Sequence, residues 1–90
     1  MPLKAALHTL TELMAKVLAP YGIRVNCVAP GATAGTKIVK NENAAQARMP
    51  LGINQPDDVV DAIVFLASDY ARNVTGQLLL VDGGRVVNRS

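Results

Sequence analysis

The sequence predicts an α/β fold with parallel strands, arranged in the order helix, strand, long connection, helix, strand. Two stretches, 23–29 and 77–82, have the composition of strands, and the second carries apolar residues on both faces, as is typical of parallel sheets. Apolar residues at helical spacing cover 3–19 and 56–68, one helix before each strand. A helix that connects two parallel strands implies a right-handed crossover, so we expect both strands in one sheet.

The composition argues against nucleic-acid and membrane binding. The 90-residue chain has nine basic and seven acidic side chains, and they are interspersed rather than gathered into a basic patch. Two tyrosines and one phenylalanine offer little surface for stacking on bases. No stretch approaches the roughly 20 apolar residues of a membrane span. We therefore expect no nucleic acid and no membrane as partners, and the net charge of +2 leaves nucleic-acid binding as the weakest alternative.

The single cysteine, Cys27, excludes a disulfide within the chain and is compatible with a reducing compartment. The first residues lack the continuous apolar run of a secretory signal. We therefore expect a cytoplasmic protein.

The stretch 3–19 is predicted to be a helix with a wide apolar stripe. Its large apolar residues at helical spacing are Leu3, Leu7, Leu10, Met14, Val17 and Leu18. Because alanines widen this stripe, we expect the helix to pack on two sides, with His8 and Lys16 in solvent. Pro20 disfavours helix at the residue before it, and Gly22 follows, so the helix should end there.

The strand at 23–29 is followed by a Pro-Gly pair. Pro30 has no N–H for a central ladder, so the strand should stop there. Gly31 permits a backbone turn that other residues resist. In open α/β sheets, ligands bind beyond the carboxyl ends of the strands, so the loop that begins at Gly31 is a candidate site.

The connection 32–55 is long for a compact domain, and connections of this length are often functional. Its middle, 38–49, could form a short helix, although that stretch is mostly polar. Pro50 and Gly52 interrupt the rest. Two interpretations follow from this pattern: a lid over a binding site, or a mobile excursion.

The second helix is predicted to begin at Pro56, because proline is favoured at the first helical position. Asp57, Asp58 and Asp61 lie in and just after the first turn, where they complement the helix dipole. We interpret these carboxylates as first-turn and solvent-facing charges, and we expect no metal site. The second strand, 77–82, is ended by two glycines.

Two parallel strands make an incomplete sheet. A typical sheet has about five or six strands, and both strands here have the composition of central ones. Unpaired backbone groups are costly when they are buried. The chain is therefore predicted to be part of a larger domain, or a subunit that borrows strands from a partner.

Across 4–84 the sequence resembles the carboxyl-terminal part of a short-chain dehydrogenase/reductase, and bacterial 3-oxoacyl-carrier-protein reductases and related alcohol or sugar dehydrogenases look most similar. The motifs that carry the resemblance are, in order, Lys4-Ala5-Ala6-Leu7, Ile23-Arg24-Val25-Asn26, Ala29-Pro30-Gly31, Phe65-Leu66-Ala67-Ser68, and Thr75-Gly76-Gln77 through Val81-Asp82-Gly83-Gly84. The resemblance implies a Rossmann-type doubly wound parallel sheet, NAD or NADP as cofactor, and hydride transfer between a small carbonyl compound and its alcohol. Residues 1–90 would be the carboxyl-terminal segment of that domain, without its Gly-rich half.

The family's catalytic motif is Tyr-x-x-x-Lys on a helix, and Lys4 matches its lysine. Residues four apart lie on one helix face, and a nearby ammonium favours the ionised tyrosine and lowers its pKa. The resemblance therefore implies that Lys4 is catalytic and also binds the nicotinamide ribose.

The resemblance also implies a cofactor-binding loop. Pro30 and Gly31 match the family's Pro-Gly element, and backbone groups near Ala32 and Thr33 would hold the nicotinamide carboxamide. The family usually has a threonine five residues after the proline. That position is a glycine here, so Thr36 would take the role in a loop one residue longer.

Two functions stay open, because the tyrosine four residues before Lys4 would precede Met1. The family's catalytic serine and Gly-rich loop also belong upstream of this match. One possibility is an oxidoreductase segment that is inactive alone and is completed by the missing half. The other is a non-catalytic, truncated interaction module that forms a homo-oligomer or associates with a full-length relative. The motifs present do not select a substrate, or NAD over NADP.

Overall fold

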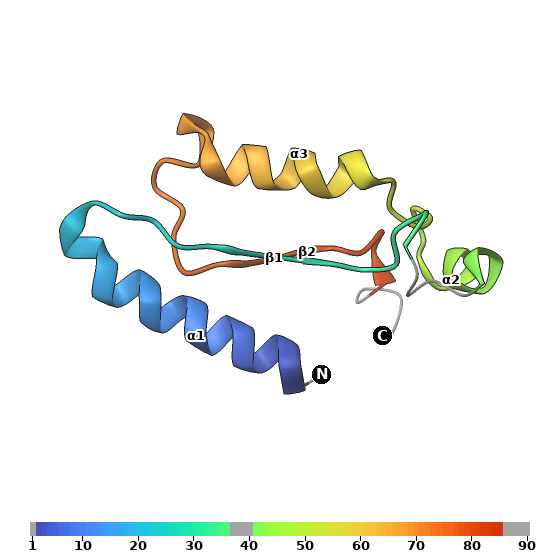
Figure 1. Ribbon diagram of the computed structural model, residues 1–90, viewed down its shortest axis with the longest axis horizontal. Coiled ribbons are helices and arrows are strands. Elements are labelled where there is room, and N and C mark those ends of the chain that lie inside the picture. Colours follow the sequence, from blue (N-terminus) through green and yellow to red (C-terminus); the bar gives the residue numbers. More distant parts are fainter. Residues whose placement is uncertain (1, 37–40, 86–90) are drawn as a thin grey trace.

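The computed structural model describes residues 2–36 and 41–85. Its elements are, in chain order, α1 (Pro2–Leu18), the 3₁₀ turn η1 (Ala19–Tyr21), β1 (Cys27–Pro30), α2 (Glu42–Arg48), α3 (Pro56–Ala67), the 3₁₀ turn η2 (Asp69–Ala71) and β2 (Leu78–Val81). The two strands pair in parallel, with Cys27 opposite Leu78 and Pro30 opposite Val81. Helices α1 and α3 lie on opposite sides of the strand pair (Figure 1). The predicted α/β fold with a parallel crossover is therefore confirmed.

Strand β1 begins four residues later than the sequence predicts. The stretch before it is held to the approach of β2 by one backbone bond, from the N–H of Gly76 to the carbonyl of Val25 at 2.7 Å, and by side chains, above all that of Asn26. The Asn26 Nδ2 donates to the carbonyl of Val74 at 2.9 Å, and the Asn26 Oδ1 accepts from the N–H of Gln77 at 3.1 Å. Side-chain bonds thus take the place of part of the ladder here, and a propensity for strand cannot reveal that.

Arg24 ties the same stretch to the carboxyl end of α3. Its guanidinium donates to the carbonyl of Leu66 at 2.8 Å, of Val74 at 3.2 Å and of Ser68 at 3.4 Å. The last carbonyls of a helix lack partners within the helix and carry partial negative charge, so a cation is favourable there. Arg24 therefore fixes the position of α3 relative to the start of β1.

Helix α3 begins as predicted, with Pro56 at its first position. The Asp58 carboxylate accepts from the backbone N–H of Gln55 at 2.7 Å, as one half of a capping box. This bond supports the interpretation of Asp57 and Asp58 as first-turn residues of the helix.

Helix α1 faces the strands with a different stripe from the predicted one. Thr11 and Ala15 are buried, and Lys4, His8 and Leu18 are half-buried. These residues follow one another at helical spacing along one side. Of the large apolar side chains of the predicted stripe, only Leu18 lies on this side, and the other five are exposed: Leu3, Leu7, Leu10, Met14 and Val17. The prediction that His8 lies in solvent is therefore wrong, whereas Lys16 is exposed as predicted.

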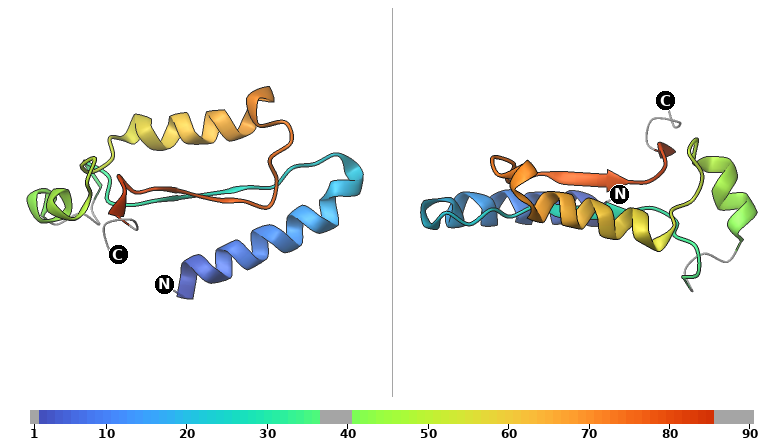
Figure 2. Two further views of the ribbon diagram at one scale, coloured as in Figure 1. Left: turned by 180° about the vertical axis from the view of Figure 1, so that it is seen from behind. Right: turned by 90° about the horizontal axis from the view of Figure 1, so that it is seen from above.

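The chain buries little apolar surface. Across the part of the chain that the structure describes, the buried apolar residues are Ala15, Ala29, Met49, Leu66 and Ala71. The accessible surface is 6623 Å², whereas a compact monomer of 9.5 kDa would expose about 5,000 Å². The radius of gyration is 14.5 Å, against about 12 Å expected for a domain of this length. The arrangement is therefore extended, as Figure 2 also shows. Across 2–36 and 41–85, no helix combines the length and apolarity needed to cross a bilayer.

Candidate functional site

The carboxyl ends of β1 and β2 lie side by side and lead into closely packed loops. The N–H of Gly31 donates to the carbonyl of Val81 at 2.8 Å and so extends the strand pairing by one bond. A Cβ on Gly31 would lie 3.1 Å from both Cα and Cβ of Asp82. The sequence argument for Gly31, a turn conformation closed to other residues, is wrong: its φ is not positive. The glycine provides space for Asp82 instead.

The loop after Gly31 pairs with the end of the long connection through an isolated parallel bridge between Thr33 and Asn54. The Asn54 N–H donates to the Ala32 carbonyl at 2.9 Å, and the Ala34 N–H donates to the Asn54 carbonyl at 2.8 Å. The backbone of Asn54 makes both bonds of this parallel bridge. The N–H and C=O of Thr33 therefore point away from Asn54. The Thr33 carbonyl accepts from the Thr36 hydroxyl at 2.9 Å. No described residue accepts from the Thr33 N–H.

The long connection is anchored at its carboxyl end. Met49 is 3% exposed, and the N–H of Leu51 donates to the carbonyl of Gly83 at 2.8 Å. The short helix expected over 38–49 is present as α2, although 38–40 lie outside the described residues. These contacts favour an ordered end of the connection over a mobile excursion, which stays a prediction for the connection as a whole. Whether the connection acts as a lid stays a prediction.

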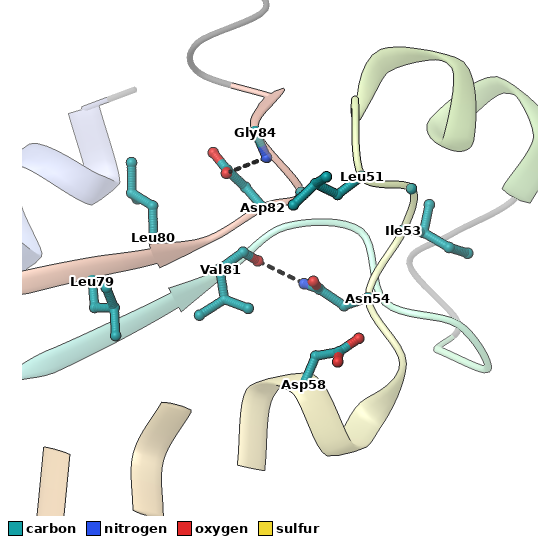
Figure 3. A pocket seen from close by; sticks show the side chains of 11 residues that line it. Leu51, Ile53, Asn54, Asp58, Leu79, Leu80, Val81, Asp82 and Gly84 are labelled. Atoms are coloured by element: carbon teal, nitrogen blue, oxygen red, sulfur yellow. Dashed lines mark hydrogen bonds between the residues drawn. The ribbon is translucent and has the colours of Figure 1, made fainter. Parts of the chain in front are cut away.

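A pocket of ≈ 420 Å³ opens beside the end of β2. Figure 3 shows its labelled residues, Leu51, Ile53, Asn54, Asp58, Leu79, Leu80, Val81, Asp82 and Gly84. The Asp82 carboxylate accepts from the N–H of Gly84 at 3.1 Å, which supports the predicted turn-capping role. The Asp58 carboxylate caps α3. Among the described residues, no three His, Cys, Asp or Glu side chains gather as ligands for one metal ion.

Five of the six predicted site residues lie at the end of β1 and in the loop after it: Pro30 ends the strand, and Gly31, Ala32, Thr33 and Thr36 follow. Lys4 lies in the first turn of α1. Helix α1 runs back along the strands, so its amino end lies toward their carboxyl ends (Figures 1 and 2). Lys4 is therefore on the half-buried side of the neighbouring helix α1, in the half of that helix that lies toward the carboxyl ends of the strands. Asn54 was not predicted, because an asparagine between Ile53 and Gln55 carries no pattern that marks it.

The comparisons with known proteins agree with one another. A family model described as Enoyl-(Acyl carrier protein) reductase matches residues 1–85. The L-rhamnose 1-dehydrogenase (NAD(P)(+)) of Azotobacter vinelandii is 50% identical over 95 aligned positions, which cover 97% of this chain and 37% of that protein. The 3-oxoacyl-[acyl-carrier-protein] reductase of Thermotoga maritima is 44% identical over 93% of this chain and 36% of its own length.

A solved structure extends the likeness to the fold. The short chain dehydrogenase from Leptospira borgpetersenii, crystallised with bound NAD+, is 39% identical and superimposes with a TM-score of 0.80. The match covers 90% of this chain and 32% of that one. The chain thus spans about a third of the length of the relatives that it matches.

Proposed function

The chain belongs to the short-chain dehydrogenase/reductase family, and we propose that it forms the nicotinamide-facing part of an NAD(P)-dependent oxidoreductase. The reaction class is the interconversion of a small carbonyl compound and its alcohol. The observation that carries the proposal is the loop after β1, which holds the Thr33 N–H without a described acceptor at the carboxyl ends of the strands.

The described residues fit a nicotinamide. The loop from Pro30 to Thr33 has Gly31 at its closest point to β2, and the Thr33 N–H is available as a donor for the carboxamide oxygen. Thr36 shapes this loop, because its hydroxyl donates to the Thr33 carbonyl. When bound, NAD(P) supplies or accepts the hydride.

Lys4 has a separate role in the proposal. Its ammonium would hold the ribose and lie beside a tyrosine four residues earlier in a preceding segment. Opposite charge favours the ionised form of that tyrosine, which would then exchange a proton with the substrate oxygen. The chain alone would be inactive, since that tyrosine and the Gly-rich loop come from elsewhere. We place the protein in the cytoplasm, which is compatible with its single cysteine.

A second candidate function is association without catalysis, and the exposed apolar side of α1 favours it. Leu3 is 65% exposed, and Leu13 and Val17 are each 57% exposed. Such a surface is typical of an interface, so the chain would form a homo-oligomer or bind a full-length relative. Light scattering of the chain should then give a mass above the 9.5 kDa of one copy, and a folded monomer would contradict this association.

The proposed activity is tested in a joined enzyme. It consists of the segment of the Azotobacter vinelandii L-rhamnose 1-dehydrogenase that precedes the matched region, followed by this full chain. We expect turnover that depends on NAD(P), assayed by coenzyme absorbance with L-rhamnose, other sugars, alcohols and ketones. The intact Azotobacter enzyme is the matched control. A joined enzyme that folds and binds coenzyme but turns over no member of the panel would contradict the proposal.

A further inference from the structure

Asn54 connects the loop after β1 with the end of β2. Its side chain is almost completely buried, with 5% exposed. The Asn54 Nδ2 donates to the carbonyl of Val81 at 2.6 Å, as Figure 3 shows. Its backbone bonds at the same time to Ala32 and Ala34. The Val81 carbonyl also accepts from the N–H of Gly31 at 2.8 Å. One carbonyl at the end of β2 therefore holds both the Asn54 side chain and the start of the loop after β1.

We infer that Asn54 is the positioning residue for the nicotinamide side of the coenzyme site. The inference rests on the proposed function. Because the backbone of Asn54 takes both bonds of the bridge, it turns the Thr33 N–H away from itself. The side chain then anchors this bridge to β2, which is the rigid element behind the loop. Asn54 thus determines the direction of the Thr33 N–H, from the side opposite to the one toward which this N–H points.

The position requires a donor. The group facing the side chain is a backbone carbonyl, which can only accept. A leucine has the same branched shape but would offer no donor, and an ionised aspartate would set oxygen lone pairs against the carbonyl oxygen. Either change leaves the backbone bridge possible but removes its anchor to β2.

Asn26 provides a matched control at the opposite ends of the strands. It makes the same kind of side-chain bond, from Nδ2 to the carbonyl of Val74 at 2.9 Å, and it also accepts from Gln77. These bonds precede β1 and β2, whereas the loop that holds Thr33 follows β1. Replacing Asn26 removes a comparable amount of structure without touching the loop that holds Thr33.

The test compares Asn54→Leu with Asn26→Leu in the joined enzyme. We expect Asn54→Leu to raise the KM for coenzyme about tenfold, the scale of one hydrogen bond, while the KM for substrate stays nearly constant. Both variants should lower the melting temperature, but Asn26→Leu should leave the KM for coenzyme unchanged. Equal effects of the two variants on that KM would overturn the inference, as would an unchanged KM in Asn54→Leu.

Asn54→Asp gives a second variant, which decides the question if Asn54→Leu does not fold. The ionised carboxylate cannot donate, so the KM for coenzyme should be raised at high pH. A protonated carboxyl group can donate to the Val81 carbonyl. The KM should therefore fall toward the parent value as the pH is lowered, relative to the parent enzyme at each pH. If the KM of Asn54→Asp for coenzyme, divided by that of the parent enzyme, did not change with pH, the result would contradict the donor role.

Amide hydrogen exchange without coenzyme separates this inference from the proposed function. The amides of Gly31 and Ala34 should exchange faster in Asn54→Leu than in Asn26→Leu, because only the first variant releases the loop. If the parent joined enzyme shows no coenzyme-dependent turnover, the proposed function fails, and the exchange rates alone decide the role of Asn54. Equal exchange in the two variants would overturn it.

Discussion

Replacing Lys4 by alanine in the joined enzyme should lower kcat by at least about a hundredfold, the scale on which a positioned acid–base group contributes. Lys4 lies on the half-buried side of the first turn of α1, one turn after the position that the family's tyrosine would occupy. Without the ammonium, the tyrosine loses its stabilised anionic form and the ribose loses a partner. Steady-state oxidation of NAD(P)H with a carbonyl substrate measures the effect.

The loss in Lys4→Ala should not come from unfolding. Lys4 is only half-buried, so its truncation to alanine should change the melting temperature little. Lys16→Ala is the matched control: this residue lies in the last turn of the same helix and is exposed. Its kcat should remain close to that of the parent. If both variants lost activity equally, or Lys4→Ala lost none, the assigned role of Lys4 would be wrong.

Replacing Gly83 by alanine should lower the melting temperature of the joined enzyme by about 10 °C. Its φ is +59°, a conformation that costs L residues about 1–2 kcal/mol. A Cβ there would also lie 2.3 Å from the Gly52 carbonyl oxygen and 3.2 Å from Met49. The backbone cannot yield freely, because the Gly83 carbonyl accepts from Leu51. Together these effects should lower the free energy of unfolding by roughly 3 kcal/mol or more. For an enzyme of this size, each kcal/mol lowers the melting temperature by about 2–4 °C.

Gly22→Ala separates the two causes. Gly22 has a φ of +72°, and a Cβ there would meet nothing within 4 Å. The substitution therefore carries the conformational cost alone, and its melting temperature should fall by about 3 °C. Differential scanning calorimetry of both variants gives the comparison. A Gly83→Ala enzyme as stable as Gly22→Ala would show that the loops after β1 and β2 are not packed as described.

The parts of the fold that local chemistry decides could be predicted from the sequence. Helix α3 begins at Pro56 because proline suits that position and Asp58 can cap the helix. The parallel pairing follows from Leu78–Val81, which is apolar on both faces. The loop after Pro30 was predicted as a site from its place at the carboxyl end of a strand, and it does lie there.

Contacts between distant segments were beyond prediction. The start of β1 depends on bonds from Arg24 and Asn26 to residues more than 40 positions away. The side of α1 that meets the strands is lined by Thr11 and Ala15, because small side chains allow close approach, while a periodicity count selects the leucines. Asn54 acts through Val81, 27 residues later in the chain, and no local pattern marks that pair.

We propose that the loop after β1 and the first turn of α1 hold the nicotinamide side of NAD(P). A crystal structure of the joined enzyme with NAD+ would reveal the distance from the Thr33 backbone nitrogen to the carboxamide oxygen. We expect a hydrogen bond of about 2.9 Å there, with the Lys4 Nζ within about 3.2 Å of a ribose hydroxyl. A nicotinamide that lies elsewhere, with the Thr33 N–H and Lys4 both out of contact with the coenzyme, would contradict this proposal.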